Sequence, residues 1–318
     1  MKTLNCREVY GRTLAEVGRE HEEIVTLEAD LGRSTQSWIF RDAFPERHFE
    51  MGIAEDNMIS TAAGLALSGK MPFVHSFSVF ATGRSYDQIR ASVCIGNLSV
   101  RIVGSSCGLS DHGDGATHQC LEDIALMRAL PNMTILAPAD GIETAKVVRA
   151  AASHRGPIYI RINRNDIPVV TSEDEPLRIG VPSIVRQGGD VTVFANGYMV
   201  SKALSAAEQL QGQGISLRVV NVSTLKPIDE RAVRAMAAGV RGVVTIEEHS
   251  IVGGLGSAIA MILAGGGVPI KFIAVADRFG QSALGYDELL EHYGLTETAV
   301  VDAVKEIISG AKIGGKLP

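Results

Sequence analysis

The regular alternation of strand-like and helix-like segments constrains the fold of this chain more than any other feature. From residue 7 to residue 162, the predicted strands are 23–28, 48–51, 71–77, 99–103, 133–136 and 157–162, and the predicted helices are 7–20, 54–67, 86–94, 121–130 and 141–152. Alternation of this kind predicts a mainly parallel sheet with helices on both faces. Ligands of such sheets bind at the carboxyl ends of the strands.

A second α/β unit follows a short linker. Residues 171–190 contain the run TSEDEP, two prolines and a Gly-Gly pair, which are typical of a surface linker. Beyond it, predicted strands at 191–195, 217–222, 243–246 and 272–275 alternate with predicted helices at 200–210, 255–263, 286–293 and 296–308. The 318 residues are enough for two domains with separate cores. We therefore predict α/β domains at 1–170 and 191–318, joined by the linker at 171–190.

Composition excludes several classes of protein. Hydrophobic residues make up 46% of the chain and charged residues 21%, as in ordinary globular proteins. The net charge of -6, with no basic run, argues against a nucleic-acid partner. No stretch approaches the roughly 20 apolar residues of a membrane span, and the N-terminus has no apolar signal core. We expect a cytoplasmic protein whose four cysteines, none in a CxxC pair, are buried free thiols.

An acidic residue lies between a predicted strand and a predicted helix, in the segment MGIAEDN. One interpretation of Glu55 is a charge in the first helical turn, which the helix dipole favours. The other is a working carboxylate, because α/β proteins bind ligands at this edge of the sheet. The residue alone leaves both interpretations open.

Two aromatic residues and an arginine follow other predicted strands. Phe77 and Phe80 lie between a strand and a helix, where a flat ring could stack on a heterocycle or could belong to the core. Arg164, in the segment IRINRND, could bind a phosphate or carboxylate, or form a surface salt bridge. These positions are candidates for one cleft at the edge of the sheet.

The segment SSCGLSDHGDGATHQCLEDI begins with a glycine-rich loop, residues 105–120, that has two histidines and two aspartates. Polar density of this kind in a loop is typical of binding or catalysis, although a solvated loop with capping residues is an alternative. A zinc site is a further alternative, but the spacing of its possible ligands matches no zinc pattern. Those possible ligands are Cys107, His112, His118 and Cys120. The later segment VGGLGSA lacks the third glycine of a dinucleotide-binding motif, so we expect a tight turn there.

The order of motifs along the chain resembles transketolases. The first unit carries, in order, ADLGRS, MGIAEDNM, FVHSFSVFATGRSYDQIR, DGATHQCLEDIALMR, PNMTILAPAD and IRINRND, like the pyrimidine-binding domain of that family. The segments RVVNVSTLKPID and TIEEHSIVGGLGSAIA resemble its C-terminal domain. The GDG...N motif of the family's other domain, which binds the diphosphate and Mg2+, is absent from this sequence. The chain therefore resembles the C-terminal-half subunit of a split transketolase.

This resemblance implies thiamine diphosphate and Mg2+ as cofactors. Glu55 matches the carboxylate that binds the pyrimidine N1′ and shares a proton with it. Phe77 and Phe80 match aromatic residues that contact the ring, and Asp30 matches an aspartate close to the cofactor. A third aromatic position of the family is Gly83 here, which implies either a looser pocket or compensation by the nearby Tyr86.

The resemblance also implies sites for a sugar phosphate. His118 and Asp114 match residues that hydrogen-bond sugar hydroxyls, and Glu55 and His118 are the expected catalytic residues. Three further residues match contacts of the substrate phosphate, namely Arg7, Ser34 and Arg164. Where the family has a histidine before the glycine-rich loop, this chain has Ser105 and Ser106, and His112 is an additional candidate contact. These departures predict an unusual ketose. No residue of this chain is assigned to a metal.

The expected partner is an N-terminal-half subunit with the GDG...N motif, in an α2β2 heterotetramer, while the chain alone could form a homodimer. The expected reaction transfers a two-carbon ketol unit from a ketose phosphate to an aldose phosphate. Alternatives are the β subunit of a 2-oxoacid dehydrogenase, a fragment of 1-deoxyxylulose-phosphate synthase, and a non-catalytic binding subunit. The DGATHQ and IRINRND segments argue against the first of these.

Overall fold

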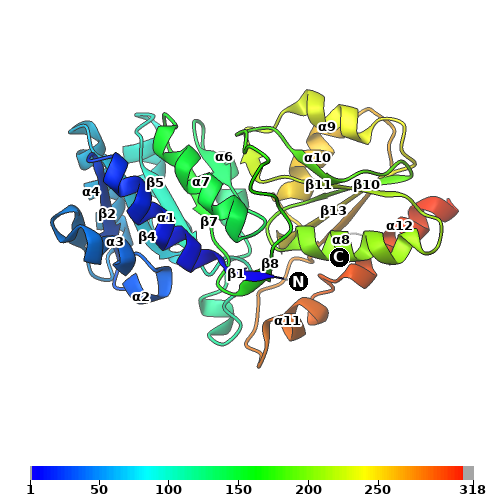
Figure 1. Ribbon diagram of the computed structural model, residues 1–318, viewed down its shortest axis with the longest axis horizontal. Coiled ribbons are helices and arrows are strands. Elements are labelled where there is room, and N and C mark those ends of the chain that lie inside the picture. Colours follow the sequence, from blue (N-terminus) through cyan, green and yellow to red (C-terminus); the bar gives the residue numbers. More distant parts are fainter. Residues whose placement is uncertain (1, 311–318) are drawn as a thin grey trace.

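The computed structural model describes residues 2–310 of the chain. Two α/β units lie side by side along the long axis, the first in blue to green and the second in green to red (Figure 1). In each unit, helices cover both faces of a mainly parallel sheet. The predicted fold class, two α/β domains, is confirmed. Residues 311–318, the end of the predicted second domain, lie outside the described part of the chain.

The sheet of the first unit is parallel except at one edge. Its strands, in spatial order, are β12 (Thr224–Lys226), β6 (Thr134–Leu136), β7 (Ile158–Arg161), β5 (Arg101–Ser105), β4 (Met71–Phe77), β2 (Ile24–Glu28) and β3 (His48–Glu50). β12 belongs to the second unit in sequence and pairs antiparallel with β6. The second unit thus completes the sheet of the first, and sequence analysis did not predict this pairing.

Helices pack on both faces of this sheet. α1 (Cys6–Glu20) and α7 (Gly141–Ser153) share a buried apolar cluster on one face. α4 (Glu55–Leu67) and α6 (Asp123–Ala129) contribute to the cluster on the other face. Shorter helices are α2 (Gly32–Thr35), α3 (Trp38–Ala43), η1 (Pro45–Arg47), α5 (Tyr86–Gln88) and η4 (Gly115–Thr117).

The second unit has the same layered arrangement. Its strands, in spatial order, are β14 (Ile270–Val275), β13 (Val243–Ser250), β10 (Val191–Ala195), β11 (Leu217–Asn221) and β9 (Ser183–Arg186). Its helices are α8 (Met199–Gln211), α9 (Glu230–Ala237), α10 (Leu255–Leu263), α11 (Tyr286–His292) and α12 (Glu297–Ser309). β9 lies within residues 171–190 and pairs antiparallel with β11. Part of the predicted linker is therefore an edge strand.

The helix predicted at 86–94 is not a regular α-helix. The chain forms the π-helices η2 (Phe80–Arg84) and η3 (Ile89–Cys94), with only the short α5 between them. The hydroxyls of Thr82 and Ser85 donate to backbone carbonyls four residues earlier, both at 2.7 Å. Such bonds compete with regular helical geometry, and π-helical turns are frequent at functional sites. η2 follows directly after β4 and therefore faces the carboxyl edge of the sheet.

A buried arginine connects the two units. Arg161, at the end of β7, donates from Nε to the carboxylate of Asp123 at 2.8 Å. Its Nη2 donates to the backbone carbonyl of Glu248, in the second unit, at 2.7 Å. Asp123 is fully buried and also accepts from the Tyr159 hydroxyl at 2.7 Å. Each charge thus has partners, as the burial of an ion pair requires.

The carboxylate of Glu248 extends this connection to the glycine-rich loop. The backbone N–H of Leu109 donates to it at 2.6 Å, and the hydroxyl of Tyr286 donates to it at 2.7 Å. Burial raises the pKa of Glu248 to about 7, although the charge of Arg161 acts in the opposite direction. The position of the loop therefore depends on the contact between the two units.

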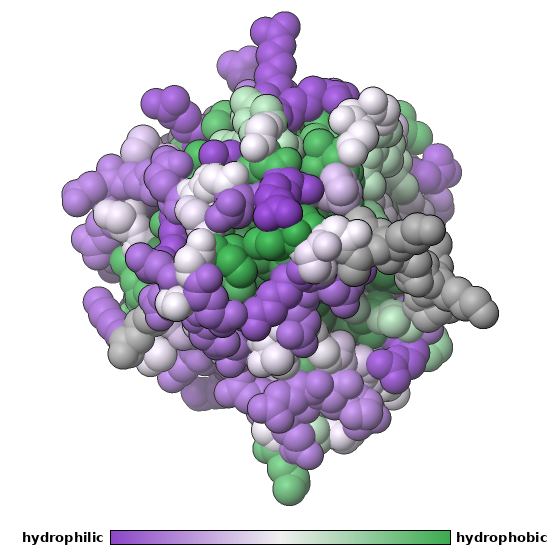
Figure 2. Space-filling view, turned by 90° about the vertical axis from the view of Figure 1, so that its right-hand side faces the viewer, coloured by the Kyte–Doolittle hydropathy of each residue, from purple (hydrophilic) through white to green (hydrophobic). Residues whose placement is uncertain are grey.

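The second unit exposes several large apolar side chains. They are Val252, Met261, Phe272, Phe279 and Leu284. Figure 2, which looks onto this end of the molecule, shows an apolar area bordered by hydrophilic side chains. Exposed apolar area of this kind is typical of a contact surface between proteins. Among the described residues, no helix combines the length and apolar character that crossing a bilayer requires.

Replacing Arg161 by methionine should strongly destabilise the chain. The variant leaves Asp123 buried without its cationic partner, which costs about 3–5 kcal/mol of unfolding free energy. Urea unfolding followed by circular dichroism measures this loss. Arg149→Met is the control, because the pair of Arg149 with Glu16 is half-exposed and such pairs contribute at most about 1 kcal/mol. Equal losses in the two variants would contradict a special role for the buried pair.

Candidate functional site

A pocket of about 370 Å³ opens at the carboxyl edge of the first sheet. Its walls come from the turn after β2, the start of α4, the π-helix η2 and the region of η4. The lining residues are Ala29, Asp30, Leu31, Ile53, Glu55, Phe80, Arg84, Thr117 and His118. The structure thus brings together residues that sequence analysis singled out from four separate segments. The pocket lies at the edge of the sheet where ligands of parallel sheets bind.

Glu55 is the buried carboxylate of this pocket. It is the first residue of α4 and only 2% exposed. Ser76, on β4, donates from its hydroxyl to Oε1 at 3.3 Å, and Arg84 donates from Nη1 to Oε2 at 3.0 Å. The N-terminus of α4 favours a negative charge at this position. Two carboxylate oxygens with only two donors leave capacity to accept a further hydrogen bond from a ligand.

The two phenylalanines have different environments. Phe77, at the end of β4, is 3% exposed and belongs to the core, whereas Phe80 lines the pocket. Their rings are nearly parallel, with an interplanar angle of 19° and centroids 6.1 Å apart. His118 meets the edge of the Phe80 ring, with centroids 5.3 Å apart at 77°. Phe80 is therefore the ring that a ligand in the pocket can contact.

Arg84 is a residue of the pocket that sequence analysis missed. Its guanidinium carbon lies 4.3 Å from the centroid of the Phe80 ring while Nη1 donates to Glu55. A planar cation that donates hydrogen bonds thus stacks on Phe80 beside the buried carboxylate. An aminopyrimidine that carries a proton has the same planarity and donor character, so the residues present fit such a ring. Tyr86, the predicted substitute for a third aromatic residue, packs against the apolar core instead.

The turn after β2 presents Asp30 to the pocket. Asp30 adopts a left-handed backbone conformation with φ of 58°, and its backbone N–H donates to Glu50 Oε1 at 2.9 Å. Glu28, at the end of β2, accepts from the backbone N–H of Leu31 at 3.1 Å and from the hydroxyl of Thr35 at 2.8 Å. Burial raises the pKa of Glu28 to about 7. This buried carboxylate fixes the turn, and no local sequence pattern indicated it.

The three residues predicted to contact a phosphate lie near one another. The antiparallel pair of β1 (Thr3–Asn5) and β8 (Asp166–Pro168) brings the start of α1 to the segment after β7. Arg7 donates from Nη1 to the backbone carbonyl of Ser34 at 2.7 Å. Burial lowers the pKa of Arg7, and the nearby charge of Arg164 lowers it further. The two guanidiniums therefore lie close enough to affect each other, and Arg164 is also paired with Asp111.

The glycine-rich loop is held in place by the second unit. The backbone N–H of Ala283 donates to the carbonyl of His112 at 2.9 Å, and Gln119 donates to the carbonyl of Gln281 at 3.0 Å. Asp114 is exposed and precedes η4. Four buried polar atoms of this loop have no hydrogen-bond partner among the described residues: Ser105 Oγ, Ser106 Oγ, His112 Nδ1 and Gln119 Oε1. Unpartnered buried groups of this kind are available to a polar ligand.

The other motifs have structural explanations. Cys6, Cys94, Cys107 and Cys120 are buried free thiols. Within residues 2–310, no group of three or more histidine, cysteine and acidic side chains is placed to hold a metal ion. In the VGGLGSA segment, the carboxylate of Glu247 accepts from the backbone N–H groups of Leu255 at 2.6 Å and Gly256 at 2.8 Å. A protein carboxylate thus occupies the N-terminus of α10, where a dinucleotide phosphate would bind.

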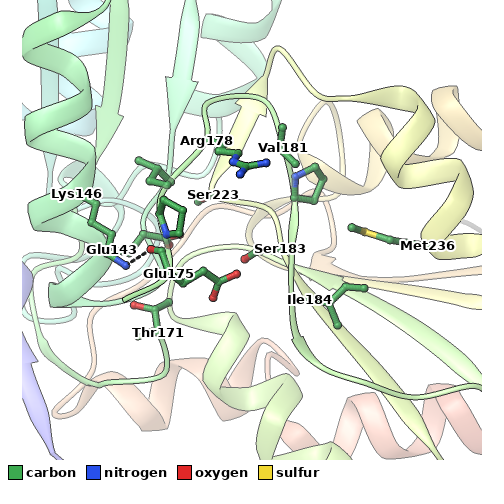
Figure 3. Close-up of a pocket in the computed structure, with 13 residues that line it drawn as sticks. Glu143, Lys146, Thr171, Glu175, Arg178, Val181, Ser183, Ile184, Ser223 and Met236 are labelled. Atoms are coloured by element: carbon green, nitrogen blue, oxygen red, sulfur yellow. Dashed lines mark hydrogen bonds between the residues drawn. The ribbon is translucent and has the colours of Figure 1, made fainter. Parts of the chain in front are cut away.

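A second pocket, of about 360 Å³, lies where the predicted linker crosses from one unit to the other (Figure 3). Lys146, on α7, donates to the backbone carbonyls of Ser172 and Glu175. Glu143 accepts from the side chain of Asn221, on β11, at 2.9 and 3.0 Å. These charged groups hold the linker and the second unit against α7. None of the predicted site residues lines this pocket.

The chain matches known proteins along almost its whole length. The model of the transketolase pyrimidine-binding domain matches residues 2–169, and that of the transketolase C-terminal domain matches residues 180–300. A 6-deoxy-6-sulfo-D-fructose transketolase subunit of Clostridium sp. (strain MSTE9) is 42% identical over 95% of this chain and 94% of that protein. Transketolase of Rattus norvegicus is 36% identical over 95% of this chain, which spans 49% of the rat protein.

A solved structure is similar over the same extent. It is described as a split-gene transketolase, an inactive β4 tetramer, and is 43% identical to this chain. The TM-score is 0.88, and the match covers 97% of this chain and 99% of the other. Sequence and structure therefore agree over both units.

Glu28→Gln should change how stability depends on pH. The pKa of Glu28 is raised from 4.5 to about 7 in the folded chain, so its stabilising contribution is full below pH 4.5 and is lost as pH rises through 7. The unfolding free energy of the native chain, relative to the variant, should fall by roughly 3 kcal/mol between these values. Urea unfolding from pH 4.5 to 8 measures the difference. If the unfolding free energies of the two proteins changed in parallel with pH, the raised pKa of Glu28 would be contradicted.

Proposed function

Because this chain belongs to the transketolase family, we propose that it is the C-terminal-half subunit of a split transketolase. The proposed reaction transfers a two-carbon ketol unit from a ketose to an aldose, both with a charged terminal group. The observation that carries the proposal is the buried carboxylate of Glu55 beside the Phe80 ring, with the planar Arg84 guanidinium stacked on that ring. The similarity to transketolases over 95% of the chain, at 42% and 36% identity, supports this reaction over that of a 2-oxoacid dehydrogenase β subunit.

Thiamine diphosphate, when bound, supplies the carbanion chemistry of the reaction. We propose that Glu55 accepts a hydrogen bond from the pyrimidine N1′ and shares its proton with that atom. Phe80 contacts the face of the ring, Phe77 supports Phe80, and Asp30 lies at the rim of the same pocket. Arg84 must leave Glu55 for this to occur, and its half-exposed side chain has solvent to move into.

The substrate is proposed to extend from the pocket along the glycine-rich loop. His118 and Asp114 would hydrogen-bond its hydroxyls, with His112 as an additional contact. Arg7, Ser34 and Arg164 would hold its terminal anion, which supports a sugar phosphate or a sulfonated sugar like the one in the name of the Clostridium relative. His118, at the edge of the Phe80 ring, is the candidate to move protons at the reacting carbon.

The proposed partner is an N-terminal-half subunit that carries a GDG...N motif. It would hold the diphosphate and Mg2+, as the unmatched half of the twofold longer rat transketolase suggests. We propose an α2β2 complex, supported by the exposed apolar area of the second unit (Figure 2). A cytoplasmic location is proposed as well, since four buried free thiols suit a reducing compartment.

The isolated chain should bind thiamine diphosphate weakly and show no turnover. Its pocket offers contacts to the pyrimidine, whereas the charged diphosphate needs the partner. Calorimetry with thiamine diphosphate and Mg2+ should show binding only after the partner is added, and mass photometry of the active complex should show two copies of each subunit. Turnover by the isolated chain, or full activity of a one-to-one complex, would contradict the proposal.

Arg164→Ala should weaken binding of anionic substrates. Loss of a hydrogen bond to a charged group should raise KM by roughly tenfold to a hundredfold for a ketose with a charged terminal group. The KM for an uncharged ketose should stay nearly unchanged. Steady-state kinetics of the reconstituted complex test this, with the exposed Arg12→Ala as control. An equal rise in KM for both ketoses would contradict the proposal that Arg164 binds the terminal anion of the substrate.

A further inference from the structure

The proposed anion site, formed by Arg7, Ser34 and Arg164, contains a buried acidic residue that the proposed function does not use. Asp111, in the glycine-rich loop, is 2% exposed, and its Oδ2 lies 2.5 Å from Nη1 of Arg164. The same carboxylate acts on Arg7, whose pKa it raises against the larger effects of burial and of Arg164. One carboxylate therefore pairs with one guanidinium and lies near a second where an anion is proposed to bind.

Hydrogen bonds hold the backbone around Asp111, and the side chain is buried against Arg164. Its backbone carbonyl accepts from Gln119 Nε2 at 3.1 Å. The preceding residue, Ser110, donates to the Cys107 carbonyl at 2.5 Å and accepts at its own carbonyl from Asn165 at 2.9 Å. The main chain therefore holds the Asp111 carboxylate beside Arg164, where an anion is proposed to bind.

The charges at this site suit a monoanion better than a dianion. Arg7 and Arg164 contribute two positive charges and the buried Asp111 removes one, whereas the charge of Asp166 is exposed and screened by water. A phosphate ester carries about two negative charges at neutral pH because its second pKa is about 6. A sulfonate has the same three terminal oxygens but a single charge. The second charge of a phosphate would face the buried carboxylate of Asp111 in a partly desolvated site, which is unfavourable.

We propose that Asp111 determines substrate specificity, by selecting sugars with a singly charged terminal group, such as a C6 sulfonate, over phosphorylated sugars. The proposal rests on the proposed transketolase function. Asp111 would affect which substrate binds in two ways. It pairs with Arg164, and it repels the second negative charge of a phosphate. The glycine-rich loop thereby combines hydroxyl contacts with a selection for charge.

The test compares kcat/KM for a C6-sulfonated and a C6-phosphorylated ketohexose in the reconstituted complex. The native complex should prefer the sulfonate, and Asp111→Asn should shift the ratio toward the phosphate by roughly tenfold or more. Asp302→Asn, which removes an exposed charge on the distant α12, should leave the ratio unchanged. A native preference for phosphate, or an unchanged ratio in Asp111→Asn, would overturn the proposal. If Arg164→Ala impairs an uncharged ketose as much as a charged one, the proposed function of Arg164 in binding the terminal anion is wrong, whatever the result for Asp111.

A second measurement uses only the native complex. Methanesulfonate and methyl phosphate serve as competitive inhibitors between pH 7.5 and 6. Methyl phosphate should bind more tightly at lower pH, because it gains a proton there. Dividing its inhibition constant by that of methanesulfonate cancels the effect of pH on the protein groups that face the site, which are Arg7, Asp111, His112, Arg164 and Asp166. The inhibition constants should converge by about tenfold toward pH 6. A constant ratio would overturn the charge selection even if Asp111→Asn failed to fold.

Discussion

The guanidinium of Arg161 fixes how the two α/β units meet, and the candidate site depends on that contact. It binds Asp123 of the first unit and the backbone of Glu248 in the second. The Glu248 carboxylate then accepts from the backbone of Leu109, at the base of the glycine-rich loop. A buried ion pair of this kind has little tolerance for displacement, because either charge alone would be strongly destabilising. The loop that carries His118 is therefore positioned by contacts outside the first unit.

The first sheet supplies the rest of the site through a property of parallel strands. All of its parallel strands end at one edge, so the turn after β2, the start of α4 and the π-helix η2 converge there. Glu55 is buried at a helix N-terminus, where its negative charge is favoured. Arg84 covers this carboxylate and the Phe80 face together. The buried charge of Glu55 is thus paired with Arg84, whose place the proposed pyrimidine ring would take.

Much of this arrangement could be predicted from sequence. The strand predicted at 71–77 has those bounds in the structure, and the convergence of Glu55, Phe80 and His118 follows from their places after strands. The contact of Arg84 with Glu55 could not be predicted, because it depends on the π-helical turn of η2 rather than on helical periodicity. The pairing of β12 with β6 and the fixation of the loop by the second unit join residues far apart in sequence, and short-range patterns carry no signal for such contacts.

The central claim is that Glu55 activates the cofactor, and exchange of the cofactor's C2 proton into heavy water tests it most directly. In the reconstituted complex, Glu55→Gln should slow this exchange by about a hundredfold to ten thousandfold, because an amide cannot share a proton with N1′ as a carboxylate does. The neighbouring Asp56 is exposed, so Asp56→Asn should have little effect. Exchange followed by NMR gives the rates. Near-normal exchange in Glu55→Gln would contradict the claim and reduce Glu55 to a charge that stabilises a helix.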